Sequence, residues 1–122
     1  MLLVDPRLLR SNCYLDGRWE AADDGRTLLV LDPASGDPLG EVPLMGAAET
    51  TRAIGAAAAA LPAWQAKTAK ERAAVLRQWF DLIVANAEDL AQLITAECGK
   101  PISEARGEVA YGASFVEWFA EE

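Results

Sequence analysis

The sequence contains no histidine, so it lacks the side chain that most often serves as a general base or a metal ligand. It also lacks the G-x-G-x-x-G and Walker patterns whose backbone amides hold phosphate groups; Gly107 and Gly112 are predicted to serve close helix packing instead. Its apolar runs stay far below the roughly 18 residues that a membrane span needs. Residues 1–10 lack the apolar core and cleavage site of a signal peptide. We therefore expect a cytoplasmic protein with no membrane partner.

Basic residues are also few, because eleven Lys and Arg stand against nineteen Asp and Glu, for a net charge of −8. A protein that neutralises phosphates needs a basic stripe, so we expect no nucleic-acid partner. The two cysteines, Cys13 and Cys98, are expected to be free thiols in a reducing compartment. Cys98 stands near the end of a predicted helix, where the helix dipole disfavours a thiolate. An inert, half-buried thiol is therefore expected there rather than a nucleophile.

The 122 residues are enough for one domain, and their pattern changes near Gly46 from strands to helices. In the β-ribbon segment, residues 1–45, Asp16-Gly17 is typical of a two-residue hairpin turn between strands at 12–15 and 18–20. A second turn at 32–37 separates predicted strands at 27–31 and 39–42. Ribbons of this size are marginal alone and need another surface to pack on.

The helical segment, residues 46–122, has clear start and stop signals. Thr68 and Glu71 form a capping-box pattern that opens a long helix, with a possible break at Asn86. Gly99 indicates a left-handed helix end, and Pro101 suits the first position of the next helix. A first helix ends near Pro62 or shortly after, and its alanine-rich run lets a neighbouring backbone approach. Apolar stripes are predicted at Ile54, Ala57, Ala58 and Leu61, and then at Ala73, Leu76, Phe80, Ile83, Val84, Ala87, Leu90, Leu93 and Ile94.

The last predicted helix has an unusual composition, since nine of the twelve residues at 109–120 are apolar. A helix that is apolar nearly all round expects cover on several sides. Trp118 and Phe119 lie together near its end, and the following acids Glu121 and Glu122 oppose the helix dipole. We expect an α+β fragment, mostly helical, with short strands followed by three or four helices whose partner surface belongs to absent polypeptide. A terminal helix docked on its own core is the alternative.

Four motifs in register resemble the aldehyde dehydrogenase family. YLDGRW at 14–19 and LDPASGD at 31–37 are similar to that family's "ING-x-W … NPA-x-G" opening, with Asp32 where Asn is usual. TAECGKP at 95–101 resembles its "E-x-GKP" signature. The run at 113–122 is similar to the branch that acts on succinate semialdehyde, and relatives acting on glutarate semialdehyde share it. The likeness extends from about residue 12 to the end of the chain.

This resemblance implies an NAD- or NADP-dependent enzyme that oxidises an aldehyde to an acid, works in 4-aminobutyrate degradation and forms a homo-oligomer. The chain would be the N-terminal portion of the dehydrogenase domain, part of its α/β cofactor-binding domain, and the remainder of that polypeptide would be its partner. The family's nucleophilic cysteine, its glutamate and its nucleotide-binding strands would lie beyond residue 122. No catalytic or cofactor-binding residue, and no cofactor, is therefore expected in this chain alone.

The resemblance also implies one possible metal site. Some members bind a structural monovalent cation between backbone carbonyls and the acid of "E-x-GKP", which correspond here to Val30, Leu31 and Glu97. Carbonyl and carboxylate oxygens suit an alkali cation. In the plainer interpretation, Glu97 faces water or caps a neighbouring segment.

Two other classes of function compete with a piece of an enzyme. One is a small, self-sufficient helical interaction module that presents Trp118 and Phe119 to a partner. The other is a regulatory relic that pairs with a full-length enzyme and impairs its assembly.

Overall fold

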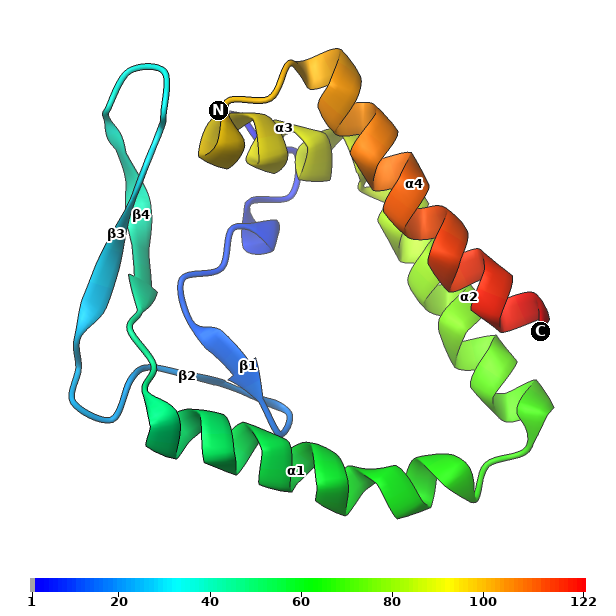
Figure 1. Cartoon of the computed structure of the whole chain (residues 1–122). Coiled ribbons are helices and arrows are strands. Elements are labelled where there is room, and N and C mark those ends of the chain that lie inside the picture. The colour runs from blue at the N-terminus through cyan, green and yellow to red at the C-terminus, as the bar shows by residue number, and fades with distance from the viewer. Residues whose placement is uncertain (1) are drawn as a thin grey trace.

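The structure is a computed structural model, and it describes residues 2–122 (Figure 1). Two antiparallel strand pairs come first and four helices follow, which confirms the predicted α+β, mostly helical class. The β3–β4 ribbon stands opposite the α2–α4 pair, and α1 runs along the edge that joins them (Figure 1). In chain order the elements are η1 (Pro6–Leu8), β1 (Cys13–Leu15), β2 (Arg18–Glu20), β3 (Thr27–Leu31), β4 (Pro38–Pro43), α1 (Ala47–Gln65), α2 (Ala69–Ala85), α3 (Ala87–Cys98) and α4 (Ile102–Glu121).

The first strand pair forms around the predicted turn. Asp16 and Gly17 both take positive φ, 47° and 79°, as a type I′ hairpin turn requires. Leu15 pairs with Arg18 next to the turn. Tyr14 lies opposite Trp19, with ring centroids 5.2 Å apart. The local turn chemistry therefore decides this hairpin, as expected.

The second strand pair forms around the predicted turn at 32–37. Asp32 Oδ1 accepts the backbone N–H of Ala34 (2.7 Å), and the Asp32 carbonyl accepts the N–H of Gly36 (2.8 Å). The ladder shifts register between Val30 and Leu31, which marks a bulge. The confirmed ribbon is thus closed by a side chain that acts within its own turn.

Helix α1 lies apart from the other helices (Figure 1). It ends at Gln65, close to the predicted stop near Pro62. Its predicted apolar stripe has no cover in residues 2–122, because Ile54 and Leu61 are both exposed. The alanines do admit a neighbour, since Ala53, Ala57 and the turn at Gly17 line one hollow of about 380 Å³.

Helices α2, α3 and α4 form the core. Thr68 Oγ1 accepts the N–H of Glu71 (3.3 Å) and Glu71 Oε2 accepts the N–H of Thr68 (2.7 Å), so the predicted capping box opens α2. Among the described residues no large side chain is fully buried, and the centre is built from small ones. These are Ala91, Ala105 and Val109, surrounded by the partly buried Ile83, Ala87, Leu90, Ile94 and Ile102.

Three predictions about the helices are wrong. Val84 is 53% exposed, because a residue directly after the inward-facing Ile83 is turned by about 100° around the helix. Gly107 and Gly112 are exposed, and an added Cβ at either would meet no atom within 4 Å, so neither serves close packing. Pro101 precedes α4 rather than beginning it, and its carbonyl accepts the first amides of that helix.

Candidate functional site

The β3–β4 turn meets the end of α3 at one close contact. Gly99 ends α3 in the left-handed conformation, with φ 70°, as predicted. A Cβ at this position would lie 3.0 Å from Pro33 Cγ. Glycine alone meets both demands, because it adopts positive φ freely and leaves room for the proline ring. Pro33 in the β3–β4 turn and Gly99 at the end of α3, which are far apart in the sequence, are therefore in contact in the fold.

Beside this contact the structure brings together two of the three residues predicted to hold a cation. Val30 and Glu97 line one small hollow of about 40 Å³, together with Glu41. Leu31 is not part of that lining; its side chain is exposed and it pairs with Pro38 beyond the bulge. Within residues 2–122 no three Cys, Asp or Glu side chains gather closely enough to hold a metal. Any cation here would therefore depend on carbonyl oxygens beside the Glu97 and Glu41 carboxylates.

The cysteines lie in different surroundings. Both are free, and Cys98 is exposed rather than half-buried as predicted, because it is the last residue of α3. The neighbouring Lys100 pairs with Glu108, and this hydrogen bond raises the pKa of the lysine. A lysine held protonated cannot take a proton from a thiol, so Lys100 is not a base for Cys98.

A carboxylate near the start of α1 joins that helix to the loop that follows β2. Glu49 is only 7% exposed; its Oε1 accepts the N–H of Asp23 (3.1 Å) and its Oε2 the N–H of Gly46 (3.0 Å). Hydrogen bonds from its own N–H, from Asp23 and from Gly46 lower the pKa of Glu49. Asp23 in turn accepts two bonds from Arg52 (2.6 and 2.8 Å), which lower the pKa of the aspartate. This network attaches the strand segment to α1.

One uncovered feature is an aromatic ridge on α4, made of Tyr111, Phe115 and Trp118. These residues follow the spacing i, i+4, i+7 and share one face. At about 100° per residue, that face is opposite the inward positions Ala105 and Val109. The three side chains are 64%, 48% and 62% exposed, and the first two rings meet edge to face at 4.9 Å. Contiguous exposed aromatics of this kind are typical of interaction surfaces.

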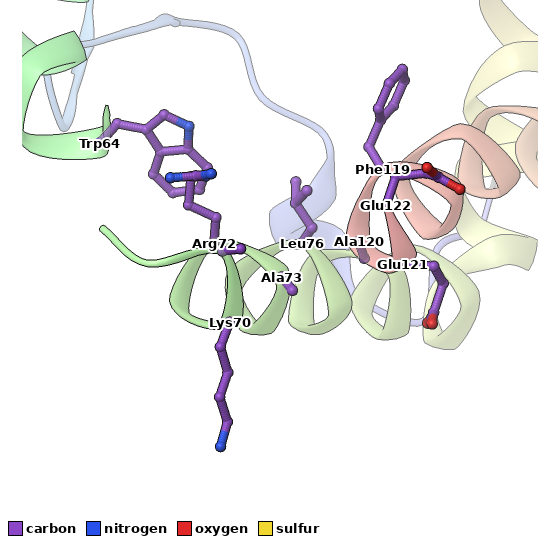
Figure 2. A pocket seen from close by; sticks show the side chains of 10 residues that line it. Trp64, Lys70, Arg72, Ala73, Leu76, Phe119, Ala120, Glu121 and Glu122 are labelled. Carbon is purple, nitrogen blue, oxygen red and sulfur yellow. The ribbon is translucent and has the colours of Figure 1, made fainter. Parts of the chain in front are cut away.

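A hollow of about 430 Å³ lies where the end of α1, the beginning of α2 and the end of α4 meet (Figure 2). Figure 2 shows Arg72 directed toward Trp64, while Lys70 points away from the hollow. Leu76 and Phe119 supply apolar surface to its lining. No helix within residues 2–122 is long and apolar enough to cross a membrane. The hollow lies beside the end of α4, and the exposed Phe119 of that helix contributes to its lining.

Comparison with known proteins decides the family. The model of the aldehyde dehydrogenase family matches residues 19–122. The chain belongs to this family. The motifs that pointed to it are thus confirmed, and the helices and ribbons are the corresponding part of the aldehyde dehydrogenase fold.

Individual aldehyde dehydrogenases match over the whole chain. A glutarate-semialdehyde dehydrogenase of Pseudomonas aeruginosa is 60% identical over 122 residues, all of this chain and 25% of the relative. The NADP-dependent succinate-semialdehyde dehydrogenase of Escherichia coli is 55% identical over the same length, again 25% of the relative. The crystal structure of a succinate-semialdehyde dehydrogenase from Burkholderia pseudomallei superimposes with a TM-score of 0.95 at 61% identity, covering 98% of this chain and 25% of that one. The chain spans about a quarter of the length of these relatives.

Two of the best-connected side chains were not singled out from the sequence. Glu49 stands three residues after Gly46, the capping-box spacing with glycine in place of the usual Ser or Thr. Asp89 lies in the first turn of α3, yet both its carboxylate oxygens bind another segment, at Val4 and Asp5. The first has a local signal that could have been read. The second depends on a contact across 85 residues, for which the local sequence has no signal.

Proposed function

We propose that this chain is the N-terminal part of an NAD(P)-dependent dehydrogenase that oxidises a dicarboxylic semialdehyde, of succinate or glutarate, to the diacid. The identities of 60% and 55% to enzymes with these two names support the substrate class. The succinate alternative would place the enzyme in 4-aminobutyrate degradation. We expect the complete enzyme to be a homo-oligomer.

The catalytic groups in this proposal belong to polypeptide outside residues 1–122. The dinucleotide would accept hydride from the substrate in the complete enzyme. This chain has no glycine-rich phosphate loop to hold it, and we derive no step through it. The contribution of residues 2–122 would be structural: the ribbons and helices would pack against the part of the enzyme that binds cofactor and substrate.

The observation that carries this proposal is the aromatic ridge on α4, together with the match to a quarter of each relative. Burying three aromatic side chains against further polypeptide would contribute several kcal/mol to folding, at about 25 cal/mol for each Å² of apolar surface. A self-sufficient interaction module is the alternative function. It would expose the same ridge, but it would also have to be stable on the small core of α2, α3 and α4.

A fusion tests the proposal against the module. The first quarter of the E. coli succinate-semialdehyde dehydrogenase is replaced by this chain, and oxidation of succinate semialdehyde is followed as NADPH formation. We expect the fusion to retain activity within about tenfold of the parent enzyme. A soluble, folded fusion without activity, together with a sharp cooperative melt of the isolated monomeric chain, would instead favour the module.

The substrate is tested with the protein's own continuation. The gene is read past the codon for Glu122, and any longer product is purified. Succinate and glutarate semialdehydes should be oxidised faster than propanal by that product. Equal rates with propanal would reject the substrate class while leaving family membership intact, and a stop codon directly after Glu122 would reject a single-chain enzyme.

The cation site remains a proposal that rests on the hollow shared by Val30 and Glu97. If Na⁺ or K⁺ binds there, replacing choline chloride by NaCl or KCl at equal ionic strength should raise the melting temperature of the fusion, and Glu97→Gln should remove the increase. Asp81→Asn, an exposed change of equal charge on α2, serves as the control. If the Glu97→Gln protein shows the same increase as the unaltered fusion, the site is rejected.

We place the enzyme in the cytoplasm, where thiols stay reduced. The free cysteines Cys13 and Cys98 support this, since an exposed thiol such as Cys98 would be oxidised readily in a secreted protein.

A further inference from the structure

A buried acid of α3 holds the beginning of the chain, residues 2–11, which we call the strap. The N–H of Val4 donates to Asp89 Oδ1 (2.9 Å), and the N–H of Asp5 donates to Asp89 Oδ2 (2.8 Å). Asp89 is only 3% exposed, although aspartate is rarely buried unless it is paired. Each carboxylate oxygen thus takes one amide of two consecutive residues, a geometry that fixes both the position and the direction of the strap.

The strap has few other attachments. The remaining hydrogen bonds of η1 are local: the amides of Leu8 and Leu9 donate to carbonyls three residues earlier, and Arg7 pairs with Asp5. In the part of the chain that the structure describes, the two bonds to Asp89 are the ones that join the strap to another element. Beyond them, Arg10 lies over the ring of Trp19, 4.9 Å from its centroid. Without Asp89 the amides of residues 4 and 5 would be left to water.

The strap lies against both the β3–β4 ribbon and α3. Figure 1 shows it, in blue, beginning beside α3 and running below that helix toward β1. Its last residues, Leu9 to Ser11, line the small hollow that also contains Val30 and Glu97. The strap therefore forms one wall between the ribbon and the end of α3. Holding it at Asp89 holds that wall in place.

Asp89 is not needed by its own helix in the usual way. An acid in the first turn commonly supports the free amides of the helix in which it lies. Here both oxygens are taken by the strap, and the adjacent Glu88 is exposed and pairs with Arg106 of α4. Two neighbouring acids in one helical turn thus have separate tasks.

We propose that Asp89 is a latch: it closes the strap over α3, and losing either side of the latch releases the strap while α2, α3 and α4 stay folded. The inference concerns this chain's own conformation and does not depend on the enzyme proposed above. Hydrogen bonds to a charged group contribute more than neutral ones, so two of them can hold a short segment that has little apolar cover.

Limited trypsin digestion of the whole 122-residue chain tests the latch at the bond after Arg10, with the bond after Arg106 in α4 as an internal reference. Asp89→Asn and Asp89→Ala should speed cleavage after Arg10 about tenfold or more. Helical circular dichroism and cleavage after Arg106 should not change. Val4→Pro, which deletes one donor without touching α3, should act in the same way, whereas Val4→Ala, which keeps the N–H, should not. Asp81→Asn, a change of equal charge at an exposed position of α2, is the control and should leave the strap closed.

Hydrogen exchange gives a second measurement on the same proteins. In the Asp89 variants, the peptide containing Val4 and Asp5 should lose its protection while peptides of α4 keep theirs. The latch is overturned if the unaltered chain is cut after Arg10 as fast as in concentrated urea, or if Asp89→Asn leaves that rate unchanged. It is also overturned if cleavage after Arg106 rises equally, or if Val4→Pro has no effect, since Asp89 would then act within α3 alone.

Discussion

Replacing Trp118 by glutamate should have different consequences in the isolated chain and in a complete enzyme. In this chain the indole is 62% exposed and belongs to the ridge, on a different face of α4 from the buried Ala105 and Val109. Its removal therefore takes little from the core. A new acid in the last turn of α4 opposes the helix dipole, so we expect the isolated chain to lose less than about 1 kcal/mol of unfolding free energy.

The loss in a complete enzyme follows from the area that the ridge leaves uncovered. An aromatic side chain buries about 200 Å² when fully covered, so a Trp118 that is 62% exposed still offers about 120 Å². At about 25 cal/mol for each Å², covering that area contributes about 3 kcal/mol, and a carboxylate placed there would add a desolvation cost. The fusion with the E. coli relative should therefore lose at least about 3 kcal/mol.

Urea unfolding, followed by circular dichroism, measures both proteins. Ala110→Glu adds the same charge on an exposed position of α4 outside the ridge, and it should cost little in either protein. Binding of an apolar dye to the isolated chain should fall with Trp118→Glu and stay unchanged with Ala110→Glu. A loss of 3 kcal/mol or more in the isolated chain would show that Trp118 is buried there, and the reasoning about uncovered surface would be refuted.

Three further predictions concern local structure, each measured by denaturation of the fusion. Gly99→Ala should cost more than Gly36→Ala, about 2–3 against about 1–2 kcal/mol, because both glycines have positive φ but Gly99 alone has another atom within 4 Å of an added Cβ; equal losses would contradict this. Thr68→Ala should cost about 1 kcal/mol and raise the pKa of Glu71 towards its ordinary 4.5, because the threonine hydroxyl is the largest cause of its lowering; an unchanged pKa, read by NMR titration, would argue against the cap. The pKa of Glu49 is lowered on folding, so the stability from its network should be complete well above pH 4.5 and lost as the pH falls below it. Glu49→Gln should reduce this loss of unfolding free energy at acid pH. An unchanged dependence of stability on acid pH would exclude Glu49 as its source.

Signals within a few residues of one another predicted much of this structure. Asp16-Gly17 specifies the first hairpin, and Thr68 with Glu71 specifies the start of α2, because each arrangement satisfies its own backbone amides. Gly99 specifies the end of α3 in the same way. None of these features needs the rest of the fold, so a single sequence is enough to predict them.

Predictions of burial and packing failed where they depend on which other element contacts the residue. Val84 fits an apolar stripe by spacing, but it is exposed, because the neighbouring Ile83 takes the inward position. Gly107 and Gly112 looked suited to close contact, yet the contact is made on another face of α4, by Ala105 and Val109. The candidate cation site shows the same limit, since the hollow at Glu97 depends on how the ribbon is set against α3.

The buried acids complete this distinction between local and distant information. Glu49 accepts one amide within its own helix start and one from Asp23, so half of its role could be read from the sequence. Within residues 2–122, Asp89 accepts amides from the strap alone, and the local sequence does not predict this role. Apolar cover is the extreme case, because the ridge of α4 is apolar in the sequence and still exposed in the structure. Local sequence thus specifies the helices and strands, whereas the surfaces that stabilise them depend on contacts with other segments. The ridge is the surface at which we expect such a contact.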